Sequence, residues 1–335
     1  MAVFTALPRA AIGRYMQEFG QGGVVVTHGT VLGSENSNFY VHTLARRLVA
    51  TVFEADVRAA LSFSACLAYA LCINGLPTPA PCCSSSAPLC STMDGRLILA
   101  CANLMGSVGL QASHAAAARA ASALALLHVT GMRCEYYCPH MHGATWVRAS
   151  VRLAASHAPH DGAHALEHEA SLLVRLVLSM GHARLPRGLC HYDLFQDNVA
   201  FATPVRTARE RLSGCFDFHF AGCGRMVMDA AILAVAWCTR GGHAARAGDA
   251  SAALHAYQAL RPLSRRERAA MHGALRAAAL RFWASRLCGY YRHRVAGLRC
   301  LHEPRAFNPA CRGWAIHTAS VQPWVLKTTC AASGR

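Results

Sequence analysis

The chain has 335 residues, of which 53% are hydrophobic and 15% are charged, so it can bury a sizeable core and is not a generally disordered protein. Its 33 Lys+Arg residues against 17 Asp+Glu residues give a formal net charge of +16, but Lys327 is the single lysine. An excess of arginine and alanine with almost no lysine indicates a bias in nucleotide composition and not a basic face, so we do not expect nucleic acid as a partner.

Strand patterns dominate the first hundred residues. Apolar residues at helical spacing predict two helices, over residues 8–19 and 59–73, each ended by a glycine. Short apolar or alternating runs predict the strands, which are residues 24–27, 39–42, 48–53 and 96–101. Residues 75–79 and 82–88 are rich in turn-forming residues and are expected to be loops.

The rest of the chain has a mostly helical pattern. The expected helices are residues 115–129, 163–179, 228–238, 251–260 and 266–290, with loops and short strands over 189–220. We therefore predict an α+β fold of two lobes with a ligand-binding cleft between them. A strand-rich N-lobe would span residues 1–102 and a helical C-lobe residues 103–311, while residues 312–335 form a tail that matches no pattern.

The cysteine content and the apolar segments bear on the compartment. Sixteen cysteines do not indicate a disulfide scaffold here, because such scaffolds are usually short, secreted and regularly spaced. Residues 1–19 lack the apolar core of a signal peptide, and the longest apolar run, residues 226–238, contains Asp229 and is too short to span a bilayer. We expect a cytoplasmic protein with reduced thiols and no membrane partner.

One stretch carries the residues that phosphoryl transfer needs. His191 precedes Asp193 by two residues, Asn198 follows that aspartate by five residues, and Asp217 follows it by 24 on an apolar strand. The reaction needs one carboxylate that accepts the proton of an attacking hydroxyl, and an amide oxygen with a second carboxylate that hold Mg²⁺. Each residue alone would more simply be a loop cap. Asp193, Asn198 and Asp217 together, in this order and after a strand-rich lobe, favour a kinase.

Longer segments resemble the bacterial homoserine kinases of the aminoglycoside-phosphotransferase-like superfamily. The similarity extends from residue 1 to about 307 and is clearest at residues 33–39, 75–79, 124–128 and 279–287. The resemblance implies a protein-kinase-like fold and the ATP-dependent phosphorylation of the L-homoserine hydroxyl to O-phospho-L-homoserine, a step of threonine biosynthesis. It also implies ATP and Mg²⁺ as cofactors, with L-homoserine as the small-molecule substrate.

The same resemblance assigns roles to individual residues. Asp193 would be the catalytic base, His191 would brace the catalytic loop, and Asn198 and Asp217 would be the Mg²⁺ ligands. The residues that would bind the nucleotide are Gly33, Ser34, Asn36, Thr51 and Asn103. The first three of these would lie over the phosphates, where glycine permits close approach of the backbone, and the last would belong to the hinge beside adenine.

Several positions depart from the family pattern. Thr51 stands where protein kinases place a lysine, and Leu32 replaces an acidic residue. Tyr192 and Gln196 replace a small and a basic residue in the catalytic loop. Ala236 stands where the family tends to carry an aspartate, which could pair with a substrate ammonium.

Two residues of the C-lobe are candidates for the substrate site. Arg281 could bind a substrate carboxylate through its two parallel N–H groups, or it could form a salt bridge on the helix surface or between the lobes. Trp237 is the other candidate, although a tryptophan at such a position is more often part of the core. Asp229 is expected to fix the core or the catalytic loop and not to touch the substrate.

Alternatives to a homoserine kinase remain open. One is a phosphotransferase of the same fold that acts on an aminoglycoside, a choline-like alcohol or a sugar. Another is a non-catalytic pseudokinase, which Leu32 and Ala236 favour and the intact catalytic loop opposes. A zinc site is a weaker hypothesis because no second ligand pair supports it; its residues would be Cys134, Cys138, His140 and His142.

Overall fold

The structure is a computed structural model. It describes residues 5–30, 36–54, 58–82, 91–108, 113–132, 138, 143–156, 167–168, 171, 174–175, 184–202, 211–238 and 247–295. The chain divides into two units. The N-terminal unit comprises Met1–Ser107, Ala200–Thr203 and Ser213–His219, and the C-terminal unit comprises Val108–Val199, Pro204–Leu212 and Phe220–Arg335.

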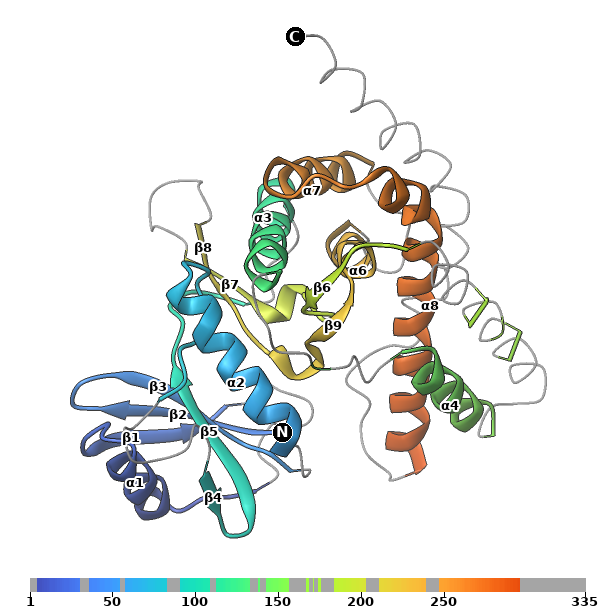
Figure 1. Ribbon diagram of the computed structural model, residues 1–335. Coiled ribbons are helices and arrows are strands. Elements are labelled where there is room, and N and C mark those ends of the chain that lie inside the picture. Colours follow the sequence, from blue (N-terminus) through green and yellow to red (C-terminus); the bar gives the residue numbers. More distant parts are fainter. Residues whose placement is uncertain are drawn as a thin grey trace. The chain divides into compact units, whose positions relative to one another are not determined.

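An antiparallel five-stranded sheet with the order β1–β2–β3–β5–β4 forms the centre of the N-terminal unit (Figure 1). The strands are β1 (Val24–Gly29), β2 (Ser37–Thr43), β3 (Arg47–Val52), β4 (Ser91–Met93) and β5 (Arg96–Ala102), and the helices are α1 (Arg9–Glu18) and α2 (Arg58–Ile73). Buried and partly buried side chains alternate along the whole of β2. This alternation is expected where the two faces of a strand meet different surroundings.

Helices pack on both faces of this sheet. On one face, Ile12 of α1 lies in a buried cluster with Phe39 of β2 and Ile98 of β5. On the other face, Leu61 of α2 lies in a second cluster with Leu97 of β5. Because Leu97 and Ile98 are neighbours in a strand, their side chains point to opposite faces, and β5 therefore contributes to both clusters.

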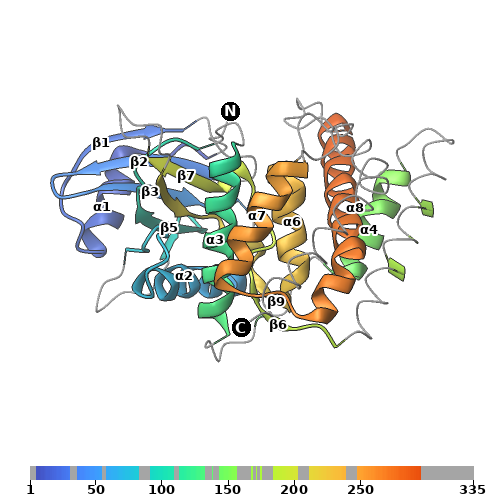
Figure 2. The same ribbon diagram turned by 90° about the horizontal axis from the view of Figure 1, so that it is seen from above.

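Helices dominate the C-terminal unit and lie side by side in the order α3, α7, α6, α8 and α4 (Figure 2). Their bounds are α3 (His114–Gly131), α4 (Ala144–Ala155), α6 (Met226–Cys238), α7 (Ala247–Leu260) and α8 (Arg265–Val295). Helix α6 is buried along almost its whole length, as expected of a helix that is apolar on all sides. It contacts α3, α7 and α8 and forms the centre of this unit.

Two pairs of short strands frame the predicted catalytic segments. Strand β6 (Arg187–Cys190) pairs with β9 (Gly222–Arg225), and β7 (Val199–Ala202) pairs with β8 (Arg211–Cys215). Single helical turns, η1 (Gln196–Asn198) and η2 (Phe218–Phe220), lie directly before β7 and shortly after β8. The segment between β6 and β7 is therefore a short loop with a strand at each end.

The predicted α+β class is confirmed, and each predicted helix and strand within the described residues is present. Strand β4 is too short to give a pattern, and α4 has no capping side chain before it, so neither is predicted. The predicted helix over 163–179 lies mostly, and the tail over 312–335 entirely, outside the described residues. Within the described part of the chain, no disulfide joins the cysteines, and no helix combines the length and apolarity that crossing a bilayer requires.

Candidate active site

The loop that joins β6 to β7 carries three of the predicted site residues. The backbone N–H of Asp193 donates to Nδ1 of His191 at 3.3 Å. The side-chain Nδ2 of Asn198 donates to the Asp193 carboxylate at 3.0 Å and to its backbone oxygen at 2.8 Å. His191 and Asn198 are buried and Asp193 is half-buried. The structure therefore brings these three residues together and leaves the Asp193 carboxylate partly accessible.

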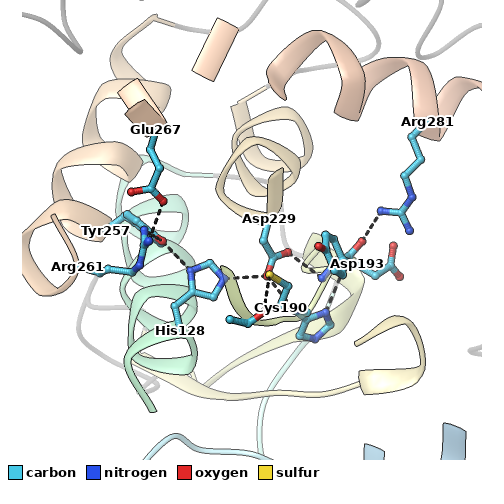
Figure 3. Close-up of polar contacts among 11 residues, drawn as sticks. His128, Cys190, Asp193, Asp229, Tyr257, Arg261, Glu267 and Arg281 are labelled. Carbon is cyan, nitrogen blue, oxygen red and sulfur yellow. Dashed lines mark hydrogen bonds and ion pairs between the residues drawn. The ribbon is translucent and has the colours of Figure 1, made fainter. Parts of the chain in front are cut away.

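Asp229 of α6 holds the beginning of this loop. Its carboxylate accepts the backbone N–H of His191 at 2.6 Å and that of Tyr192 at 2.7 Å, and it accepts Nε2–H of His128 at 3.0 Å (Figure 3). Burial alone would raise the pKa of Asp229, but the hydrogen bonds that its carboxylate accepts from the His128 ring and from the His191 backbone outweigh burial and lower it. The prediction that Asp229 fixes the loop is confirmed, and a buried carboxylate is the anchor.

Tyr192 has an unusual backbone and a closely fitted side chain. Its φ of 64° lies in the left-handed region, which a bulky residue seldom adopts and which is often found at functional sites. The ring is buried, and its hydroxyl lies so close to Gly224 of β9 that a Cβ atom there would be 1.6 Å away. The hydroxyl also bonds the Cys190 thiol. The tyrosine that departs from the family pattern thus packs the loop against β9.

Two further side-chain hydrogen bonds join the same loop to α6. Trp237 is 1% exposed, and its Nε1–H donates to the Leu194 carbonyl at 2.9 Å. Gln196 reaches in the other direction, since its Nε2–H donates to the Ala236 carbonyl at 3.1 Å. Both contacts fasten the loop to α6, and the two departures at Gln196 and Ala236 turn out to be neighbours.

Arg281 of α8 lies near Asp193, the predicted catalytic base. Its Nη1–H donates to the Tyr192 carbonyl at 2.9 Å, and its guanidinium lies 4.9 Å from the centre of the Phe282 ring. Burial lowers the pKa of Arg281, and the negative charge of Asp193 partly offsets this effect. The guanidinium therefore places a positive charge near Asp193, and it is buried among rings and not spread on the helix surface.

Two predicted nucleotide-binding residues lie at one end of β3 in the N-terminal unit. The Thr51 hydroxyl donates to the side-chain oxygen of Asn38, its register partner in β2, at 2.7 Å. Asn36 accepts the backbone N–H of Glu54 through its side-chain oxygen at 3.4 Å. A neutral pair thus stands at Thr51, where a protein kinase has a lysine.

Glu54 ties this end of the sheet together, and the sequence reasoning does not single it out. Its carboxylate accepts the hydroxyls of Ser37 at 2.6 Å and Thr5 at 2.9 Å, and Nε–H of Arg96 at 3.1 Å. Burial would raise the pKa of Glu54, but the two hydroxyls and the Arg96 guanidinium outweigh it and lower the pKa. The signal that could have found it is an acidic residue directly after a strand in a chain with few acidic residues.

The remaining predicted residues are placed separately or not described. Asn103 lies at the other end of β3, where its backbone N–H donates to the Arg47 carbonyl at 3.0 Å. Asp217 follows β8 in the N-terminal unit, is exposed, and has a φ of 64°. Cys138 is described, and its carbonyl accepts the backbone N–H of Cys223. The predicted residues outside the described part of the chain are Leu32, Gly33, Ser34, Cys134, His140 and His142.

The chemistry of the donor set fits Mg²⁺. Because Nδ2 of Asn198 donates twice to Asp193, its side-chain oxygen is the atom left to accept a cation. The other predicted ligand, Asp217 of the N-terminal unit, has an exposed carboxylate. Amide and carboxylate oxygens are hard ligands, which Mg²⁺ prefers over nitrogen and sulfur.

Comparisons with known proteins all find phosphotransferases or kinases. The model of the phosphotransferase enzyme family matches residues 30–263. A protein of Burkholderia thailandensis named homoserine kinase is 33% identical over 324 residues, which are 96% of this chain and 98% of that protein. The fold is similar to an aminoglycoside phosphotransferase from Alicyclobacillus acidocaldarius at a TM-score of 0.60 and 15% identity, with 96% of this chain and 95% of that one covered. It is also similar to a choline kinase from Streptococcus pneumoniae at a TM-score of 0.61 and 12% identity, with 93% and 98% covered.

Proposed function

Because the chain belongs to the phosphotransferase enzyme family and is a small-molecule kinase with an alcohol group as acceptor, we propose that it is a homoserine kinase. It would transfer the terminal phosphoryl group of ATP to the side-chain hydroxyl of L-homoserine and release O-phospho-L-homoserine, for threonine biosynthesis. The observation that carries this proposal is the 33% identity to a protein named homoserine kinase over nearly the full length of both chains. The aminoglycoside phosphotransferase and the choline kinase are 15% and 12% identical to this chain, so their similarity shows the fold alone.

In this proposal, the catalytic loop supplies the proton acceptor. Asp193 would orient the substrate hydroxyl and accept its proton, and the Asn198 amide would hold the Asp193 carboxylate in place. His191 and Asp229 would hold the backbone of the loop in place, since Asp229 accepts the His191 amide and His191 accepts the Asp193 amide. Positioning of this kind supplies most of the rate enhancement when the transition state of phosphoryl transfer is loose.

The proposed Mg²⁺ ligands are the side-chain oxygen of Asn198 and the carboxylate of Asp217. When bound, the ion would neutralise charge on the phosphates of ATP. Asn36, Thr51 and Asn103, together with Gly33 and Ser34, remain the proposed nucleotide-binding residues of the N-terminal unit. Thr51 would contribute a hydroxyl in place of the usual ammonium group.

The substrate side of the proposal depends on Arg281. Its guanidinium is a fixed positive charge close to Asp193, so it would attract the carboxylate of an amino acid and repel a quaternary ammonium group. A planar guanidinium can still bind a carboxylate while one of its N–H groups serves the Tyr192 carbonyl. Trp237 would act through the Leu194 carbonyl, since its ring is almost fully buried.

The test is an ADP-release assay with a panel of acceptors. L-Homoserine, its decarboxylated analogue 3-aminopropan-1-ol, choline and kanamycin are compared at equal concentrations. We expect turnover with L-homoserine and little with the analogue, and we expect that preference to shrink by about tenfold or more in Arg281→Met, because the variant has no cation for the carboxylate.

Two outcomes would overturn the proposal. Turnover of choline or kanamycin but not of L-homoserine would assign another acceptor to the same fold. Absence of turnover with the whole panel would favour a protein that binds nucleotide without catalysis. Equal preference for L-homoserine in the parent protein and in Arg281→Met would refute the role of Arg281 alone.

A further inference from the structure

A continuous chain of buried polar side chains crosses the C-terminal unit and ends at the catalytic loop (Figure 3). It starts at Glu267 near the beginning of α8, whose carboxylate accepts Nη2–H of Arg261 at 2.7 Å. Arg261 also donates Nη1–H to the Tyr257 hydroxyl at 2.8 Å. Tyr257 lies 2.6 Å from Nδ1 of His128, and His128 lies 3.0 Å from the Asp229 carboxylate. The five residues come from α3, α6, α7, α8 and the segment after α7.

For a neutral His128 ring, the chemistry of the two ends fixes the direction of every hydrogen bond between them. A guanidinium can only donate and a carboxylate can only accept. The Tyr257 oxygen therefore accepts from Arg261, and its own proton goes to Nδ1 of His128. His128 must then carry its proton on Nε2, from which it donates to Asp229. One tautomer of a neutral His128 satisfies every bond in the chain.

Because these five side chains are buried, each of their polar groups needs its hydrogen-bond partner. Exposure is 0% for His128 and Asp229, 1% for Glu267, 2% for Tyr257 and 7% for Arg261. Burial also raises the pKa of Tyr257, so the hydroxyl keeps the proton that it donates. In such surroundings a lost partner leaves a polar group unsatisfied, which is more unfavourable than the bond itself was favourable.

The same cluster could be mistaken for a metal site. Ligand atoms of His128, Cys190 and Asp229 lie within 4.8 Å of one another, and all three residues are buried. However, both ring nitrogens of His128 have partners, and the Asp229 carboxylate already accepts three N–H groups. A metal would have to displace these bonds, so the hydrogen-bonded interpretation is the consistent one.

We propose that His128 and Tyr257 are positioning residues for phosphoryl transfer: they orient the Asp229 carboxylate, which holds the His191 and Tyr192 amides and thereby places Asp193. This inference rests on the proposed kinase function for its kinetic test only. The Asp229 carboxylate can rotate about its side-chain bonds. The Nε2–H of His128 is the side-chain donor that selects one orientation of the carboxylate. Without it, the N–H donors to Asp229 in the described part of the chain are the His191 and Tyr192 amides, which move with the loop itself.

The first test removes one hydroxyl. Tyr257→Phe deprives Nδ1 of His128 of its donor and Nη1 of Arg261 of its acceptor, so we expect kcat to fall by about tenfold or more with the KM for ATP unchanged. Tyr15→Phe is the matched control. Tyr15 is equally buried at 2% exposure, and its hydroxyl bonds the backbone of β5 in the N-terminal unit. The control should lose similar stability but keep its kcat.

The second test separates the effect of the His128 hydrogen bonds from the effect of the volume of its side chain. Glutamine can accept from Tyr257 through its oxygen and donate to Asp229 through its nitrogen, whereas leucine can do neither. We expect His128→Gln to retain much more of the parent kcat than His128→Leu when both are folded. Double substitution with Tyr257→Phe should add little to His128→Leu, because both changes break the same chain.

An activity-independent measurement completes the test. The ¹⁵N chemical shifts of the His128 ring nitrogens should report a proton on Nε2 in the parent protein. The same shifts should change in Tyr257→Phe. A proton on Nδ1 in the parent, or a kcat in Tyr257→Phe equal to that of Tyr15→Phe, would overturn the proposal. If the parent shows no turnover with any acceptor, the proposed function fails, while the ring shifts still decide the direction of the chain.

Discussion

The contact between Gly224 and Tyr192 allows a sharp prediction for Gly224→Ala. An added Cβ would lie 1.6 Å from the tyrosine hydroxyl oxygen and 2.8 Å from the ring carbon that bears it. Ordinary contact requires about 3.5 Å, so the hydroxyl must retreat by about 2 Å. The φ of Gly224 is not positive, so alanine suits the backbone there and the effect is purely one of space.

The expected loss of stability has two parts. Overpacking a buried site typically costs about 1–3 kcal/mol. Moving the hydroxyl also breaks its bond to the Cys190 thiol, which contributes about 1 kcal/mol or less. We therefore expect Gly224→Ala to lower the free energy of unfolding by about 2–4 kcal/mol. Activity should fall as well, because Tyr192 directly precedes Asp193.

A double-mutant cycle isolates the contact. Tyr192→Phe removes the atom at 1.6 Å and leaves the one at 2.8 Å, so Gly224→Ala should be milder by about 1 kcal/mol or more in that background. Urea unfolding of the four proteins measures each free energy. If Gly224→Ala unfolds within about 0.5 kcal/mol of the parent, or if the two changes are additive, the ring does not lie against β9 and the reasoning is refuted.

Three further predictions concern separate features. Asp217→Asn should abolish ADP release without changing the circular dichroism spectrum, because it removes the proposed Mg²⁺ carboxylate, and near-normal turnover would mean that this residue is not the ligand. The lowered pKa of Glu54 implies a contribution to stability that is fully present above its ordinary value of 4.5 and is lost as the pH falls through the lower value of the folded protein. Thermal unfolding between about pH 3 and 6 should therefore show a shallower acid loss in Glu54→Gln, and parallel curves would contradict this account. Burial raises the pKa of Cys215 to about 12, so at pH 8 a thiol reagent should modify the exposed Cys66 and spare Cys215 in the folded protein, as peptide mass spectrometry would show.

The local features of the fold could be predicted from the sequence because each depends on neighbouring residues. Alternation along β2 and the continuous apolar run of α6 are properties of short segments, and both elements are present. The spacing of Asp193 and Asn198 within one loop is equally local, and the structure joins them by a hydrogen bond. A short loop between two strands leaves these side chains little freedom to separate.

The contacts that hold the loop could not be predicted, because they join distant parts of the chain. His128 and Asp229 are 101 residues apart, and Arg281 and Tyr192 are 89 residues apart. Periodicity indicates that a residue is buried but not which partner it meets there. For Trp237 the sequence left the core and the site as alternatives, and only its bond to the loop explains how a core residue can serve the site.

Helix α6 carries one further consequence for how this protein would lose activity. The amides of His191 and Tyr192 bond a fully buried carboxylate on α6, so opening the loop alone would leave that carboxylate buried without two of its N–H donors, which is strongly unfavourable. The catalytic loop therefore belongs to the same cooperative unit as the core. On heating, the enzyme would stay fully competent until that unit unfolds, and it would have no partly active intermediate in which the loop alone is open.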